Sequence, residues 1–342
     1  MNMQSLATLP HLDRIDLLLG HPQEQRDMAW LEASLQSAVS VEFSTIPPYL
    51  CALWSIKDET DDVAKSIRNV VQEEMLHMAL ACNMLTAVGC VPKIRDPHSV
   101  PTYPGHVPGA VHPELTVSLS GLSDASLDVF SAIEEPTRGP SAAPGPEHDT
   151  GYKTIGAFYD AILDAFRTLQ PELSTERQVT GPLAYMVMED LHAVEAAITL
   201  IKDQGEGSEV SPVVAHTDEL AHYHRFLEVR HCKRFSGLDA SGQPIFDGPP
   251  LPRPETWPMA VVPAGGYTQS AVPADVWKLA NRFDQTFTQL VDRLQAVWEH
   301  GDQASLVHAV ETMFALSEQA RALMSIEIAG GPGTYGPSFR LL

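Results

Sequence analysis

The sequence predicts an all-α protein: a four-helix bundle with additional C-terminal helices and long proline-rich loops. The prediction depends on long segments of helical periodicity and on the positions of the prolines. Of the 27 prolines, ten fall in 92–146 and eight in 244–273, and the periodic segments between these stretches nearly lack them. Because proline interrupts helices, we expect these two stretches to be loops.

The first two helices are expected to form a hairpin. Residues 27–57 carry apolar side chains at helical spacing and begin at Asp27, a residue type that caps helix N-termini. Residues 62–88 form the second helix, which ends before Gly89. The turn at 58–62 is short, so the two helices must run antiparallel.

Helical periodicity returns after the first loop. A short run of alternating apolar residues, 115–120, suggests a strand within that loop. A second hairpin is expected from two longer helices joined by a turn after 205–207, and a further pair follows at the C-terminal end. The expected helices are 155–169, 182–204, 213–230, 275–299 and 304–328.

The chain is long enough for one large domain. We expect the bundle in 1–235, with a long insertion at 90–154, and a proline-rich crossover and helical pair in 236–342, packed on the bundle as one compact domain. Loops of this length in a compact domain are usually functional. Residues 92–146 and 275–328 are therefore expected to wall off a substrate pocket over the site described below.

Charge and composition narrow the function classes. Lys and Arg number 22 and Asp and Glu number 44, so the formal net charge is −22, which repels nucleic acid and anionic membrane surfaces. No apolar stretch is long enough to span a membrane, and no signal peptide is evident, so a cytoplasmic location is expected. The four scattered cysteines are expected to be reduced. A small-molecule substrate is the expected partner; a homo-oligomer or a biosynthetic partner enzyme stays open.

Two Glu-x-x-His motifs carry the expected chemistry. They are Glu74-Met-Leu-His77 in the second helix and Glu219-Leu-Ala-His222 in the fourth. On a helix, residues three apart point the same way, so each motif offers a carboxylate and an imidazole to one point. Glu42 lies on the apolar stripe of the first helix at a similar height to Glu74, and a buried carboxylate needs a partner. The pattern predicts a metal site in the bundle.

The ligand from the third helix stays open. On the helical wheel, Glu189 falls opposite the core stripe and is expected in solvent, whereas Asp190 and Glu195 flank the stripe. Glu195 is closer in height to Glu219 and is the first choice. Glu206, in the turn, is the second choice because a bend could aim it at His222.

Carboxylate and imidazole ligands without thiolate favour iron, as one or two ions, with manganese as the other candidate. Tyr49 lies two turns from Glu42 on the same face. It is a candidate catalytic phenol or hydrogen-bond donor, and the alternative interpretation, which the pattern favours, is a tyrosine of the core. Pro47 and Pro48 interrupt the helix between them, which would either open room beside the metal or bend the helix for packing.

Several segments resemble a known family, namely VEFSTIPPYLCALWSI (41–56), EEMLHMALACNML (73–85), IKDQGEG (201–207) and ELAHYHRFLEV (219–229). They are similar to the ferritin-like domain of the iminophenyl-pyruvate dimer synthases of violacein and chromopyrrolate biosynthesis. The resemblance extends through 152–162, SAIEEP (131–136) and the terminal GPSF. By motif, it implies a site made of Glu42, Glu74, His77, Glu206, Glu219 and His222, whereas Glu195 depends on the wheel alone.

The resemblance implies a ferritin-like fold and a non-haem iron oxidoreductase of secondary metabolism, using O2 or peroxide. The substrate would be a small aromatic molecule or an amino-acid-derived imine. Two alternatives come from other classes: a ferroxidase or iron-binding ferritin-like protein, and a binding module that has lost its metal.

Overall fold

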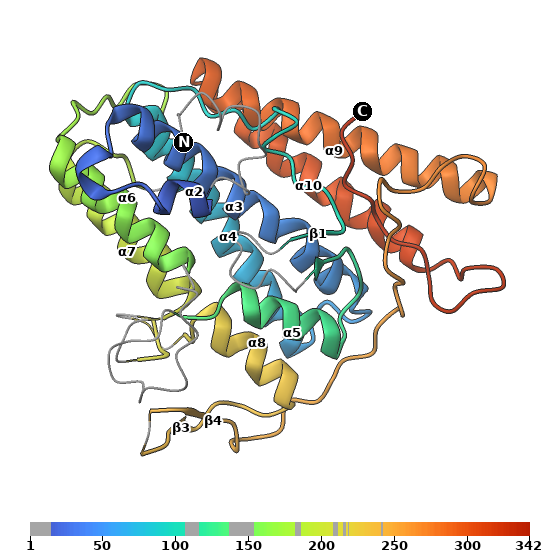
Figure 1. Ribbon diagram of the computed structural model, residues 1–342. Coiled ribbons are helices and arrows are strands. Elements are labelled where there is room, and N and C mark those ends of the chain that lie inside the picture. The colour runs from blue at the N-terminus through green and yellow to red at the C-terminus, as the bar shows by residue number, and fades with distance from the viewer. Residues whose placement is uncertain are drawn as a thin grey trace.

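The computed structural model describes residues 15–106, 116–136, 154–181, 186–207, 211–214, 217, 219–240 and 242–342. The predicted all-α class is confirmed (Figure 1). The elements are α2 (Ile15–Leu19), η2 (Gln23–Gln25), α3 (Met28–Ser55), α4 (Asp62–Ala87), β1 (Gly105–His106), β2 (Thr116–Val117), α5 (Asp124–Ile133), α6 (Ile155–Leu169), α7 (Leu191–Gly205), α8 (His222–His231), β3 (Gly237–Leu238), β4 (Pro244–Ile245), α9 (Ala274–His300) and α10 (Gln303–Met324).

The first hairpin forms as predicted, with α3 and α4 packed along their lengths. Asp27 caps α3, because its side chain accepts a hydrogen bond from the amide of Trp30, and Asp61 caps α4 in the same way. Gly89 ends the second helix with φ of 90°, a conformation that favours glycine.

Pro47 and Pro48 both lie inside α3. Since proline has no amide hydrogen, Pro48 cannot donate to the carbonyl of Ser44, four residues earlier. The Tyr103 hydroxyl donates to that carbonyl instead, at 2.7 Å. A residue of the proline-rich loop thus satisfies a backbone group that the helix leaves free.

The third helix is shorter than the expected 182–204. It begins at Leu191, where the Asp190 side chain caps it. Immediately before it, the Gln178 amide hydrogen-bonds both the N–H and the carbonyl of Met188, which holds that segment out of a helix. Residues 182–185 lie outside the described residues.

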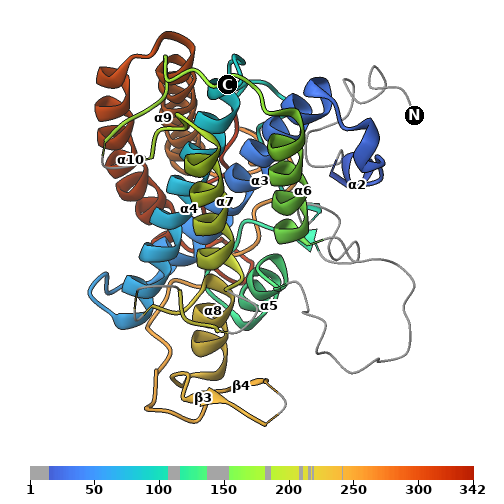
Figure 2. The ribbon, with the colours of Figure 1, turned by 90° about the vertical axis from the view of Figure 1, so that its left-hand side faces the viewer.

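The fourth helix begins at His222 and not at 213. Val213 and Leu220 form an antiparallel bridge, and Ala221 has an extended conformation. Glu219 therefore lies before the helix, and Glu219-Leu-Ala-His222 is not a helical motif. Instead of a long hairpin, α7 and α8 follow one another along one side of the molecule (Figures 1 and 2). α6 packs on α7, and α5 packs on α8.

The proline-rich insertion contains a helix, α5, that the periodicity did not predict. Ser123 and Ser126 form a reciprocal capping box at its start. The expected strand within 115–120 is reduced to β2, which pairs antiparallel with β1. Residues 107–115 and 137–153 lie outside the described residues.

α9 and α10 form the predicted C-terminal hairpin, and α10 ends at Met324 where the expected helix ran to 328. The hairpin forms a layer on one side of α3 and α4, with α6 and α7 on the other side (Figure 2). Ser338 and Arg340 bind the buried Asp284 of α9, which fixes the C-terminal segment. Among the described residues, no helix combines the length and apolarity that a membrane crossing requires.

Candidate metal centre

A cluster of carboxylates and imidazoles is buried where α3, α4, α5 and α8 meet. It consists of two groups, Glu42, Glu74 and His77, and Glu74, Glu134 and His222, which share Glu74. In each group the candidate ligand atoms lie within 4.8 Å of one another. No side chain of the cluster is more than 8% exposed. Such an acidic cluster is costly to bury without protons or cations to balance it.

The His77 ring has one nitrogen directed at the cluster. Nδ1 lies 3.6 Å from Glu42 Oε2 and 3.7 Å from Glu74 Oε1. Nε2 is 2.8 Å from the amide oxygen of Gln204 in α7, which therefore accepts a hydrogen bond from the ring. In the neutral ring, this bond places the proton on Nε2 and leaves the Nδ1 lone pair facing the carboxylates.

His222 has the same arrangement. Nε2 bonds Glu73 at 2.8 Å, and Arg225 holds that carboxylate from the other side at 3.0 Å. Nδ1 lies 2.8 Å from Glu74 Oε1 and 3.8 Å from Glu134 Oε2, but it makes no hydrogen bond of acceptable geometry. A buried imidazole nitrogen with no hydrogen bond, set among carboxylate oxygens, fits a metal ligand.

Metal-binding histidines usually ligate through one ring nitrogen and donate a hydrogen bond from the other to an oxygen outside the site. Both imidazoles have this second hydrogen bond, from Nε2. The donor set of carboxylate oxygens and imidazole nitrogens suits iron or manganese. The residues present fit a metal centre.

Three hydroxyl groups hold the carboxylates. The Tyr159 hydroxyl lies 2.5 Å from Glu42 Oε1, the Tyr49 hydroxyl 2.7 Å from Glu134 Oε1, and the Thr45 hydroxyl 2.5 Å from Glu74 Oε2. Burial and the neighbouring carboxylates hold the pKa of both phenols well above its usual value. Both tyrosines therefore remain hydrogen-bond donors at neutral pH.

Without a metal, the cluster retains protons. Burial, with the charges of Glu134 and Glu42, raises the pKa of Glu74 to about 6 despite the opposing effect of His222. Burial lowers the pKa of both histidines, but the surrounding carboxylates outweigh it and raise the pKa of His77 and, more strongly, of His222. A divalent cation would displace these protons.

Of the residues predicted from the sequence, Glu42, Glu74, His77 and His222 come together, with Tyr49 at the edge of the cluster. Glu206 ends α7 and is in neither group. Its carboxylate lies against the first turn of α6, where a Cβ at Gly156 would be only 1.9 Å from Oε1.

The other predicted acids do not join the cluster. Glu195 is 34% exposed and pairs with Arg167 at 2.8 Å. Glu219 is 52% exposed and pairs with Arg225 at 3.1 Å. Asp190 is the N-cap of α7, and Glu189 is exposed, as predicted.

Sequence reasoning missed Glu134 as a ligand candidate. It follows the last residue of α5, a helix that was not predicted, and it takes the place expected of an acid in the third helix. The only sequence signal was the SAIEEP segment, which was noted for its resemblance. Glu73 was also missed, although it directly precedes Glu74.

The C-terminal helices wall a cavity, but it does not lie over the cluster as expected, and no described residue of 92–146 lines it. This cavity of about 370 Å³ lies between the α3–α4 pair and the α9–α10 pair. No residue of the metal cluster lines it.

Comparison with known proteins agrees with the fold. A family model described as "Ferritin-like" matches residues 35–231. Dichlorochromopyrrolate synthase from Lentzea aerocolonigenes is 25% identical over 320 residues, which cover 83% of this chain and 30% of that protein. The chain thus spans less than a third of the length of this relative.

A solved structure, that of a ferritin-like protein from Caulobacter vibrioides, superposes with a TM-score of 0.64 at 22% identity. The match covers 92% of this chain and 99% of the other. At this identity the likeness shows the fold alone.

Proposed function

The chain belongs to the ferritin-like family, and on that premise we propose that it is a metal-dependent oxidative enzyme of specialised metabolism. The observation that carries the proposal is the pair of histidines around Glu74. Each imidazole is fixed from outside through Nε2 and turns Nδ1 toward the shared carboxylate. This arrangement prepares two adjacent positions for cations, so we propose that two metal ions bind, with iron as the metal.

Each residue of the cluster has a role in this proposal. Glu74 would be shared by both ions, while Glu42 and Glu134 would each belong to one. Tyr159 and Tyr49 hold these two outer carboxylates, so each leaves its other oxygen for a metal. Iron, when bound, supplies the redox chemistry, and the chain supplies a buried, fixed set of ligands.

The relative supports a proposal for the substrate class. A protein named dichlorochromopyrrolate synthase aligns with most of this chain, and the sequence segments quoted above resemble the iminophenyl-pyruvate dimer synthases. We propose an aromatic imine derived from an amino acid as the substrate. O2 or peroxide would accept the electrons removed when two such molecules are coupled. In this proposal an amino-acid oxidase supplies the imine.

Substrate-dependent oxidation tests the proposal. The full chain is loaded with Fe(II) without oxygen, then exposed to O2 and to an imine generated in place from an aromatic amino acid by an amino-acid oxidase. A product with the mass of two imines less two hydrogens is expected from the wild-type chain and not from the His77→Ala/His222→Ala variant. Equal product from both proteins, or none from a fully loaded wild-type chain with phenylalanine- and tryptophan-derived imines, would contradict it.

A further inference from the structure

The cavity between the bundle and the C-terminal hairpin is a second candidate site. Its wall is mostly apolar and includes Phe43, Leu50 and Trp54 from α3, Met75 from α4 and Leu290 from α9. A volume of about 370 Å³ falls in the range of small-molecule sites. The cavity is separate from the cluster, so its occupant need not be a substrate of the metal centre.

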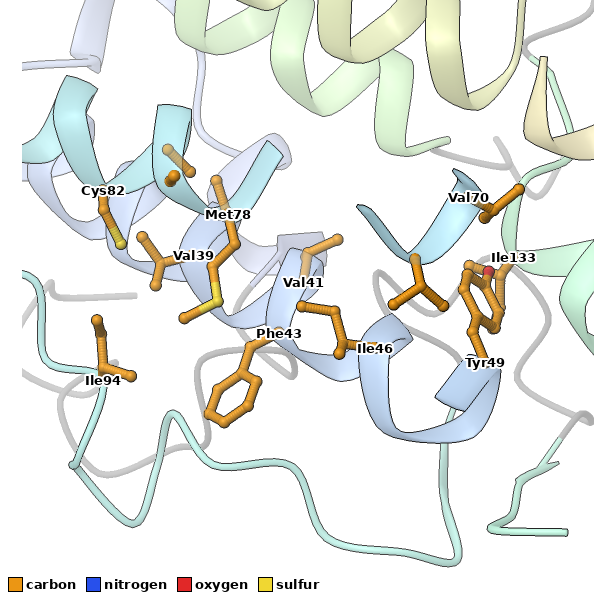
Figure 3. Close-up of a cluster of buried hydrophobic side chains, with 14 of the residues drawn as sticks. Val39, Val41, Phe43, Ile46, Tyr49, Val70, Met78, Cys82, Ile94 and Ile133 are labelled. Carbon is orange, nitrogen blue, oxygen red and sulfur yellow. The ribbon is translucent and has the colours of Figure 1, made fainter. Parts of the chain in front are cut away.

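The helical positions explain this separation. Phe43, Met75 and Met78 line the cavity, and each is the direct neighbour of a cluster residue. Successive side chains on a helix diverge by about 100°, so the cavity occupies the adjacent face of the same two helices. In Figure 3, Phe43 and Met78 lie apart from Tyr49, whose hydroxyl reaches the cluster. The α3 and α4 backbones thus divide the two sites.

The wall of the cavity carries a cation with unused hydrogen-bond donors. Arg68 lines it and makes a single hydrogen bond within the described residues, from NH2 to the Glu59 carbonyl at 2.9 Å. Its other guanidinium N–H groups have no partner in that part of the chain. By contrast, Arg321 is occupied by the carbonyls of Ile56 and Lys57 and by the Glu59 side chain.

The outer edge of the cavity is also apolar. Phe314 of α10 lines the cavity and is 72% exposed, an unusual exposure for a phenylalanine. Apolar surface therefore continues from the cavity to the outside of the molecule at Phe314. An apolar cavity with one available guanidinium in its wall is complementary to a molecule with an apolar body and one negative end.

From these observations we propose that the cavity binds an apolar monocarboxylate, with the body between α3, α4, α9 and α10 and the carboxylate on Arg68. The chain has a net charge of −22 and as a whole repels anions. The positive charge of Arg68 would attract a carboxylate at this one place. Alkyl and aromatic carboxylates share this chemistry, and the probes below distinguish them.

The test measures binding to the full-length chain by calorimetry, with Trp54 and Trp298 of the cavity wall as fluorescent reporters. Decanoate and indole-3-propionate are the two probes, and decanol is the uncharged control. At least one carboxylate is expected to bind saturably at one site, and to bind more tightly than decanol. Arg68→Gln should weaken carboxylate binding about tenfold and leave decanol unchanged, because a charged hydrogen bond is lost. Arg282→Gln, an exposed arginine of α9 outside the cavity, is the matched control.

Filling the cavity provides the second arm. Ala79→Phe should abolish binding of all probes, and Ser317→Phe, at a less buried lining position, serves if that variant does not fold. The His77→Ala/His222→Ala variant should bind as the wild type does, so the result does not depend on the proposed function. The proposal is overturned if no probe binds saturably, if neither filling variant weakens binding, or if Arg68→Gln has no effect. If the number of sites per chain decreases as the protein concentration is raised, a second copy of the chain occupies the cavity, and this result would also overturn the proposal.

Discussion

Five buried titratable side chains form a cluster that cannot carry all of its charges without compensation. Each carboxylate has a fixed hydroxyl partner, and each imidazole is held through Nε2. The partners orient the ligands but do not neutralise them, since Tyr49 and Tyr159 remain uncharged. A cation or retained protons must therefore supply the balance.

Glu134 and Glu195 offer a direct comparison at this scale. Glu134→Gln is expected to lower iron content, because an amide is a much poorer ligand for a hard cation than a carboxylate. Glu195→Gln should leave iron content unchanged, since the partly exposed Glu195 side chain pairs with Arg167 outside the cluster. Iron is measured per chain by mass spectrometry after loading and desalting. If Glu195→Gln loses iron and Glu134→Gln does not, the ligand is Glu195 of the third helix, as expected from the sequence.

Gly156 provides a second test. A Cβ there would lie 1.9 Å from Glu206 Oε1, so Gly156→Ala must displace this carboxylate or α6. We expect a loss of about 1–3 kcal/mol in the free energy of unfolding, although alanine ordinarily favours a helix over glycine. Urea denaturation measures it. In the Gly156→Ala/Glu206→Ala variant the loss caused by Gly156→Ala should shrink; an equal loss in both backgrounds would show that the two residues do not interact.

The helical wheel explains which residues could be predicted. It correctly placed Glu42 and His77 toward the core, because their burial depends on the angle around one helix. Glu189 is exposed as expected, but it precedes α7, so its exposure does not follow from a helical wheel. The wheel could not place Glu195, because exposure at the edge of a stripe depends on which neighbouring helix covers it. Glu134 comes from the end of a helix in a segment assigned as loop, so no wheel could include it.

Among the helices, those with long, continuous periodicity could be predicted from the sequence, whereas the late starts of other helices could not. α3, α4, α6 and α9 agree with the expected ranges within two residues. The late starts of α7 and α8 depend on contacts distant in sequence, such as the Gln178 amide on Met188 and the bridge between Val213 and Leu220. The candidate site lies among these helix ends, which is why its ligands were harder to predict than the fold.

The proline pair in α3 supports a stability prediction. Tyr103→Phe removes the donor to the Ser44 carbonyl that Pro48 leaves unbonded. We expect a loss of about 1–3 kcal/mol in the free energy of unfolding, because a buried acceptor would lack a partner. Iron content should stay unchanged, since Tyr103 does not contact the cluster. Chemical denaturation and metal analysis of the same preparation measure both; unchanged stability would show that water replaces the hydroxyl.

The whole molecule should respond to pH through the metal-free cluster. The pKa of Glu74 rises from 4.5 to about 6, and the pKa of His77 and of His222 rises above 6.5. The folded chain thus holds these protons more tightly than the unfolded chain. Their contribution to stability is complete below the ordinary pKa values and is lost as pH rises through the folded values.

Metal-free wild-type protein is therefore expected to lose stability, relative to a His77→Gln/His222→Gln variant that keeps Glu74, as pH rises above about 6.5 through the raised pKa values of the two histidines. Loading with metal should reverse this trend, because the ligands release protons on binding. Denaturation at a series of pH values, with and without Fe(II), measures the difference. A metal-free wild type that gains stability over the variant across this range would contradict the assignment.

Binding of two ions around a shared Glu74 is the claim on which the proposed function depends, and anaerobic titration of the metal-free chain with Fe(II) measures it. We expect two equivalents per wild-type chain, one for His77→Ala, one for His222→Ala and none for the double variant. His308→Ala, an exposed histidine of α10, should keep two. Iron beyond two equivalents would favour a storage protein, and no binding by the wild type would favour a metal-free module. Full occupancy in the double variant would contradict the claim outright.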